Sequence, residues 1–126
     1  MTTPFIFVTT HEVDPRRQDE FRALTAEYTE FVRANEPTML AHHTYLDPER
    51  SEVSLVQIHK DAASADRHLQ LVEPMLARAG ELSRPVRVEV YGEPGPVVAK
   101  ALRANADRGV VVTVSPATLP GFTRAA

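Results

Sequence analysis

Residues 39–60, MLAHHTYLDPERSEVSLVQIHK, contain two segments that are typical of β-strands, 39–46 and 53–60. Both are rich in aliphatic, β-branched or aromatic residues, and the polar stretch 47–52 between them has the composition of a turn. Two strands joined by so short a connection predict an antiparallel hairpin. The segments on either side of this hairpin indicate the fold to which it belongs.

The chain before the hairpin predicts one strand and one long helix. Residues 4–13, PFIFVTTHEV, are largely β-branched and aromatic, which favours a strand. Asp14 and Pro15 then provide an N-cap and a proline in the first turn, a favourable helix start. Apolar residues recur at helical spacing up to about Asn35, where we expect the helix to end because Pro37 disfavours the α region before it.

The chain after the hairpin predicts another helix and another strand. Residues 61–79 predict a second helix, capped by Asp61 or Ser64, which Pro74 breaks or kinks. Residues 86–91, VRVEVY, alternate strictly and predict a fourth strand. The order β-α-β-β-α-β predicts an α+β fold, a ferredoxin-like antiparallel sheet with two helices on one face.

We expect residues 1–93 to form this ferredoxin-like domain and residues 94–126 to form a C-terminal extension that packs on the domain or on a partner chain. In the extension, residues 97–106 favour a short helix and residues 110–114, VVVTV, favour a strand. This strand should pair with the main sheet or with a second chain, because a valine-rich open edge invites aggregation. Phe122 is expected to be a packing residue.

The predicted first strand is apolar on both faces. Phe5, Phe7 and Val13 share one face by strand parity, and Ile6 and Val8 share the other. Two helices cover only one face of such a sheet, so the other face requires a second layer. We therefore expect a homodimer in which the sheets of two copies pack face to face.

Composition excludes several classes of protein. The 126 residues include no Cys and no Trp. The absence of Cys excludes disulfides, thiol nucleophiles and cysteine-bound metals. No Gly precedes Gly80, so a phosphate-binding loop cannot lie in the first two thirds. Lys and Arg number 14 against 17 Asp and Glu and form no basic stripe, which argues against nucleic-acid binding. The apolar run near the N-terminus is too short for a signal peptide or a membrane span, so no membrane partner and a cytoplasmic location are expected.

Three stretches resemble a known family. They are 5–15, with its Val-Asp-Pro exit into a long helix, 35–49, NEPTMLAHHTYLDPE, and 53–69, VSLVQIHKDAASADRHL. Together they resemble the antibiotic biosynthesis monooxygenase-like (ABM) domains of the dimeric α+β barrel superfamily, over about residues 4–93. The resemblance implies a homodimeric barrel with a pocket between sheet and helices in each subunit. It also implies an activity from a set that includes cofactor-independent oxygenases of aromatic polyketides and quinols, and haem-degrading enzymes.

Some positions depart from the family pattern. His59 stands where many relatives carry Trp, and Thr9 stands where haem-degrading members carry Asn. Both departures argue against haem degradation. His42 matches a second-strand position that is often aromatic, whereas His68 matches a histidine common in relatives.

Histidine is the side chain best suited to chemistry in this composition, because a neutral imidazole in an apolar cavity can accept and return a proton. By parity His42 and His43 point to opposite faces, so only one of them can enter the pocket; the family places His42 there, and the other register would exchange the two. We expect His59 and His68 to be the catalytic residues. The expected substrate-binding residues are Thr9, His11, Phe21, Leu24, Tyr28, His42 and Gln57.

The expected function is a cofactor-independent monooxygenase, or a related enzyme, that acts on a small aromatic or quinol substrate. A dimeric protein that binds a small hydrophobic ligand or is simply structural is the alternative, and a haem-binding protein is a third. We expect no cofactor, as the resemblance implies. We also expect no metal, since the resemblance implies none and no H-x-x-x-H spacing occurs; a zinc site built from three imidazoles is the alternative.

Overall fold

The computed structural model describes residues 3–124 and has an α+β fold built on one five-stranded sheet. The strands are β1 (Phe5–Val13), β2 (Met39–Asp47), β3 (Glu52–His59), β4 (Ser83–Tyr91) and β5 (Val111–Ser115). Their order is β2-β3-β1-β4-β5. All pairings among β1, β2, β3 and β4 are antiparallel, as the ferredoxin-like prediction requires, whereas β5 is parallel to β4.

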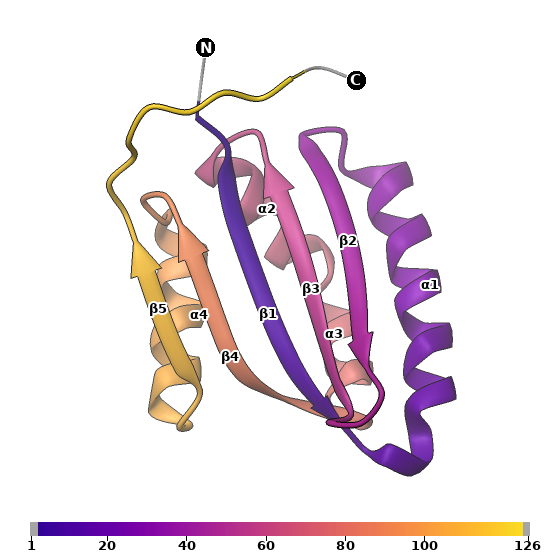
Figure 1. Ribbon diagram of the computed structural model, residues 1–126. Coiled ribbons are helices and arrows are strands. Elements are labelled where there is room, and N and C mark those ends of the chain that lie inside the picture. The colour runs from indigo at the N-terminus through magenta and orange to yellow at the C-terminus, as the bar shows by residue number, and fades with distance from the viewer. Residues whose placement is uncertain (1–2, 125–126) are drawn as a thin grey trace.

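The helices all lie on one side of this sheet (Figure 1). They are α1 (Gln18–Asn35), α2 (Ala62–Leu71), α3 (Glu73–Ala79) and α4 (Pro96–Asp107). Asp14 caps a single 3₁₀ turn, Pro15–Arg17, which leads into α1. Pro74 interrupts the second predicted helix as expected, since α2 ends at Leu71 and α3 begins at Glu73. None of the helices in residues 3–124 is both long and apolar enough to cross a membrane.

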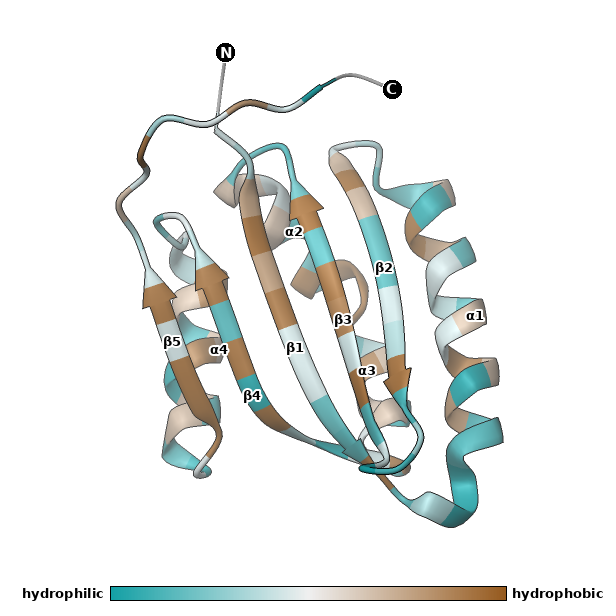
Figure 2. Ribbon diagram, viewed as in Figure 1, coloured by the Kyte–Doolittle hydropathy of each residue, from teal (hydrophilic) through white to brown (hydrophobic). Residues whose placement is uncertain are grey.

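The core fills the space between the sheet and the helices. Phe5, Phe7 and Val13 of β1 point into it, as parity predicted, and α1 contributes Phe21 and Val32. Hydrophobic residues recur along the central strands, whereas the helices show mixed faces (Figure 2). The helix-side face is therefore the buried face of the sheet.

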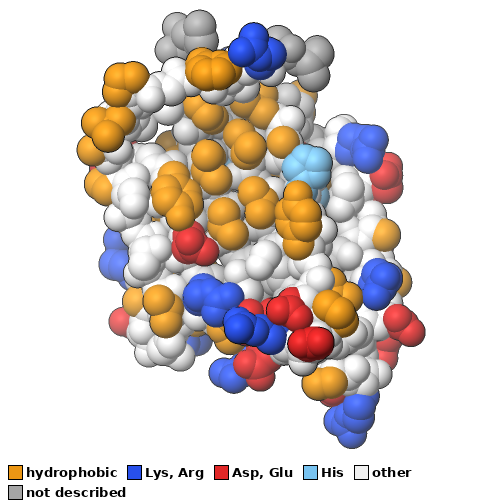
Figure 3. Space-filling view, viewed as in Figure 1, with side chains coloured by type: hydrophobic (Ala, Val, Ile, Leu, Met, Phe, Trp, Pro, Cys, Tyr) orange, Lys and Arg blue, Asp and Glu red, His pale blue; other side chains and the backbone are white. Residues whose placement is uncertain are grey.

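The opposite face of the sheet has no helix over it. Side chains of Ile6 and Val8 lie there, next to Val56 and Ile58 of β3. The space-filling view shows hydrophobic side chains gathered over this face (Figure 3). Tyr45 of β2 is 63% exposed.

The C-terminal segment contributes to the same layers. Strand β5 pairs with β4, one of the two arrangements expected for the valine-rich run. Helix α4 packs against α2, and Val98 and Leu102 enter the core beside Ala65. Residues 116–124 continue as an extended tail, in which Phe122 is 80% exposed. Phe122 is therefore not a packing residue within the described chain itself, and its packing on a partner chain stays a prediction.

Candidate functional site

The strand register brings polar side chains together in the middle of the helix-side face. His42 of β2 lies opposite Gln57 of β3, and Gln57 and His59 share that face because they are two residues apart. His43 is exposed on the other face, opposite Val56. Three further side chains come from the helices and a loop: Tyr28 of α1, His68 of α2, and Glu36, which follows α1.

Glu36, His68 and Tyr28 form a buried hydrogen-bonded chain. Nδ1 of His68 lies 2.9 and 2.8 Å from the two carboxylate oxygens of Glu36, so this nitrogen donates. Nε2 of His68 therefore accepts from the Tyr28 hydroxyl at 2.6 Å. All three residues are at most 7% exposed. A carboxylate that orients an imidazole, which in turn faces a hydroxyl group, is an arrangement suited to proton transfer.

The chain continues on the other side of Tyr28. The Gln57 amide donates to the Tyr28 hydroxyl at 3.0 Å, and its oxygen faces Nε2 of His59 at 3.4 Å. Nδ1 of His59 lies 2.8 Å from the Ser64 hydroxyl. Ser64 in turn accepts from Thr38 at 2.9 Å.

The bonds all run in one direction. Arg67 donates to Thr38 at 2.8 Å, so an arginine begins the series and the Glu36 carboxylate ends it. Each intermediate group donates toward Glu36 and accepts from the side of Arg67, which satisfies every member only when both histidines are neutral. These groups therefore form one cooperative polar network. We call it the relay; it consists of Arg67, Thr38, Ser64, His59, Gln57, Tyr28, His68 and Glu36.

Burial determines the charge of several groups at the site. Desolvation lowers the pKa of His59 to about 4, with a smaller contribution from nearby His68, so His59 is neutral at pH 7. Desolvation likewise lowers the pKa of His42 to about 4. It raises the pKa of the Tyr28 hydroxyl, against the opposing effect of the Gln57 hydrogen bond. Proton acceptors and a proton donor thus lie side by side in their neutral forms.

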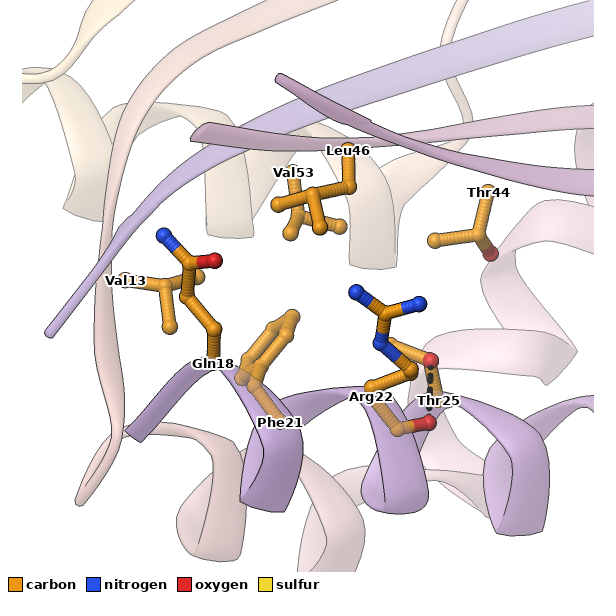
Figure 4. A pocket seen from close by; sticks show the side chains of 8 residues that line it. All are labelled: Val13, Gln18, Phe21, Arg22, Thr25, Thr44, Leu46 and Val53. Carbon is orange, nitrogen blue, oxygen red and sulfur yellow. Dashed lines mark hydrogen bonds between the residues drawn. The ribbon is translucent and has the colours of Figure 1, made fainter. Parts of the chain in front are cut away.

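A pocket of about 180 Å³ opens between α1 and the sheet (Figure 4). Its apolar walls are Val13, Phe21, Leu46 and Val53. Its polar lining residues are Gln18, Arg22, Thr25 and Thr44.

Thr44 connects the pocket to His42, the imidazole beside the relay. The Thr44 hydroxyl is 3.4 Å from Nε2 of His42, and the His42 ring lies 5.3 Å from the Tyr28 ring. Nδ1 of His42 is buried and has no partner within residues 3–124. Leu55 packs against the core clusters on both sides and separates the two regions. His42 is thus the imidazole that lies between the pocket and Tyr28.

The structure brings together most of the predicted site residues, but in two groups. Tyr28, Gln57, His59 and His68 belong to the relay, with His42 beside it. Phe21 lines the pocket, and the His11 ring packs against it at 6.2 Å.

Two other predicted residues lie apart from the relay. Thr9 lies on the same face, opposite Leu55. Leu24 is buried and borders a surface groove between α1 and α3 instead.

Sequence reasoning missed Glu36, Ser64 and Arg22. Glu36 lies outside any periodic segment, and its only signal was its place in the NEP stretch of the family resemblance. Ser64 was considered only as a helix cap, a role that Asp61 fills by accepting from the Ser64 backbone N–H.

Among residues 3–124, no group of three or more His, Asp or Glu side chains is arranged to hold a metal ion.

Comparison with known proteins gives the same fold. The family model described as "Antibiotic biosynthesis monooxygenase" matches residues 4–74. No curated protein sequence matches the chain at a significant level.

Several solved structures share the architecture. MupZ from Pseudomonas fluorescens superposes with a TM-score of 0.74 at 20% identity, over 98% of this chain and 96% of that one. Rv0793 from Mycobacterium tuberculosis superposes with a TM-score of 0.62 at 23% identity, over 70% of this chain and 92% of that one. A candidate antibiotic biosynthesis monooxygenase from Caulobacter crescentus superposes with a TM-score of 0.63 at 21% identity, over 69% of this chain and 86% of that one. At these identities the likeness concerns the fold, and in MupZ it extends through the C-terminal segment.

Proposed function

Because the chain belongs to the antibiotic biosynthesis monooxygenase family, we propose that it is an oxygenase that acts without a cofactor on a small aromatic or quinol substrate. The observation that supports this proposal best is the buried series Glu36–His68–Tyr28 beside a pocket. A neutral imidazole held by a carboxylate is a suitable general base. The family relationship supplies the reaction class and these contacts supply candidate roles.

In this proposal His68 accepts a proton from Tyr28, and Glu36 keeps the His68 ring oriented. His42, which lies beside Thr44, contacts the substrate and accepts its proton first, and this proton passes to Tyr28 as Tyr28 loses its own. His59 is enclosed and bonded on both nitrogens, so we assign it a positioning role that acts through Gln57.

The chemistry requires dioxygen as the oxidant. Loss of a proton converts the substrate into an electron-rich anion, which can reduce dioxygen. For an activated CH₂ group, one oxygen atom becomes the new carbonyl oxygen, and the other leaves as water with the two hydrogens of that carbon. The chain's part is to form the anion and to exclude water from it.

Oxygen uptake with a panel of quinols and anthrones tests this function. We expect His68→Ala and Tyr28→Phe to lower kcat by roughly 10²- to 10⁴-fold, the usual range for general acid–base groups. His43→Ala removes a histidine from the opposite face and is the matched control. The proposal is wrong if no substrate is oxidised, or if the His68 and Tyr28 variants turn over as fast as the control while remaining folded by circular dichroism.

A second candidate is a protein that binds a small ligand without catalysis. The observation that favours it is the completeness of the relay, in which His59, His68 and Gln57 are each bonded within the chain. A fully bonded buried network of this kind can specify a unique arrangement of the core without taking part in catalysis. Saturable binding of a panel compound without oxygen uptake would favour this candidate.

Haem binding is less well supported. Both ring nitrogens of His59 and of His68 have partners within the chain, so neither histidine presents a free nitrogen to iron. A saturable Soret shift on titration with haemin would nevertheless establish it.

We further propose that the protein acts as a homodimer in the cytoplasm. The support is the apolar sheet face without helices, which includes Val8 and Val56 (Figure 3). Association through this face would bring the two sheets together and bury side chains such as Tyr45.

A further inference from the structure

Arg22 is unusual among the arginines of α1. Arg33 of α1 pairs with Glu30 at 3.5 Å, and Arg17, in the 3₁₀ turn just before α1, pairs with Glu20 at 2.8 Å. Arg22 has no acidic partner in the part of the chain that the structure describes. Its guanidinium group points away from the helix and into the pocket, towards the walls formed by the strands (Figure 4).

The pocket offers this arginine no compensating charge. Its eight lining residues include no Asp or Glu, so Arg22 is the only charged group among them. Arg22 is an exposed residue at the mouth of the pocket, and its guanidinium group reaches over the apolar side chains of Phe21, Leu46 and Val53 (Figure 4). A guanidinium group in such surroundings favours a planar anion, to which it can donate two parallel hydrogen bonds.

Thr25 and Thr44 add hydroxyl groups, and Gln18 adds a side-chain amide, around the same space. The Gln18 amide already donates to Ser51 at 3.0 Å, and the Thr25 hydroxyl donates to the backbone oxygen of Arg22 at 2.8 Å. Arg22 therefore remains the donor in the pocket that is best placed for a ligand.

The size of the pocket limits the ligand. A cavity of about 150 Å³ is large enough for benzene. The pocket of about 180 Å³ therefore suits one ring with a small substituent, and a ligand of several fused rings would have to project from its mouth.

We propose that this pocket binds a small aromatic anion, a single ring that carries a carboxylate or an ionised phenol, with Arg22 as its counter-ion. The inference rests on the proposed function, whose substrate class it narrows. The apolar walls hold the ring, and Arg22 fixes the anionic group. Anchored in this way, the ring lies beside Thr44 and thus next to His42.

Titration calorimetry with benzoate and with benzamide, its neutral counterpart of the same shape, tests the proposal. We expect benzoate to bind to the unmodified chain and benzamide to bind at least roughly tenfold more weakly. Arg22→Gln should weaken benzoate binding by about the same factor and leave benzamide binding unchanged. Arg22→Lys should fall between the two, because it keeps the charge but loses the planar fork.

Arg103→Gln is the matched control, because it removes the same charge from the exposed face of α4. Changes in the amide NMR chemical shifts on addition of benzoate locate its binding site. We expect these changes at Thr25, Thr44 and Val53. The proposal is overturned if benzoate does not bind, if benzamide binds as tightly, if Arg22→Gln and Arg103→Gln behave alike, or if the shifts lie elsewhere.

The outcome is separable from that of the proposed function. Benzoate binding that depends on Arg22, without oxygen uptake on any substrate, would support this inference and contradict the oxygenase. Oxygen uptake that depends on His68, without benzoate binding, would do the reverse.

Discussion

His11 is a half-buried residue whose Nδ1 atom is buried and makes no hydrogen bond within residues 3–124. Its ring packs against Phe21, and burial lowers its pKa to about 4 from an ordinary value near 6.5. An unfolded chain would therefore bind a proton at this position between pH 6.5 and 4 when the folded chain does not. The free energy of unfolding must fall as the pH falls through that window, and the contribution of His11 is fully present above it.

Replacing His11 by Leu should make stability less sensitive to acid. Burial also lowers the pKa of His42 and His59 to about 4. The three histidines together therefore lower the free energy of unfolding between pH 6.5 and 4, and we expect His11→Leu to remove roughly a third of that decrease. A shift of this size corresponds to at most about 3 kcal/mol for one group. Urea unfolding at several pH values measures the effect, with His43→Gln as the exposed control. Equal slopes in the two variants would contradict the prediction.

At the residue scale, strand parity predicted the relative positions well and the hydrogen bonds poorly. It placed His42 and His43 on opposite faces, because strand side chains alternate whatever the rest of the fold does. It could not reveal that Glu36 bonds His68, because a loop residue has no period and its partner is 32 positions away. The chemistry at the site depends on this long-range contact.

Helix α4 is capped by a side chain from another element. Its N-cap residue is Gly95, which has no side chain, and the Asp66 carboxylate of α2 accepts from the backbone N–H of Val98 at 2.8 Å. A Cβ atom added to Gly95 would clash with the other carboxylate oxygen of Asp66. The joint between α2 and α4 therefore depends on a small residue and an acid together.

Gly95→Ala should destabilise the protein by about 1 kcal/mol, because Asp66 has to leave its place and the cap is lost. Asp66→Ala should cost a similar amount for the same reason. The double variant should cost clearly less than the sum, since both changes remove one interaction. Thermal unfolding measures all three, and Gly121→Ala, whose added Cβ meets nothing within 4 Å, is the control. Strict additivity would show that the two residues act separately.

At the element scale, prolines and caps predicted the ends of the helices closely. Pro37 and Pro74 each mark an end, because proline restricts the residue before it and lacks a backbone donor. The pairing of β5 remained open, since a run of valines favours a strand but not a particular neighbour.

The whole molecule has one covered sheet face and one apolar face without helices (Figures 1 and 3). Exposed apolar patches of this kind mark interfaces in proteins. The sequence already indicated this asymmetry, because β1 is apolar on both sides and only two helices were predicted to cover it.

Sedimentation should therefore give twice the mass of one chain at micromolar concentration. Tyr45→Glu should reduce this to the mass of one chain, because it places a charge in the proposed interface, and the 63% exposure of Tyr45 leaves the monomer's own core intact. Leu76→Glu, an exposed apolar position on α3, is the control and should remain a dimer. A single-chain mass for the unmodified protein would contradict the proposal.

The central place of β1 has a consequence for how the chain folds during synthesis. β1 leaves the ribosome before the other strands of the sheet, yet its neighbours are β3 and β4, and Ile6 pairs with Tyr91 near the far end of the domain. Such distant pairings are slow to form, because a long loop has to close before they stabilise anything. Until β4 has emerged, a strand that is apolar on both sides lacks one of its neighbours. Delayed synthesis between β3 and β4 should therefore favour aggregation of this protein more than a delay after β4.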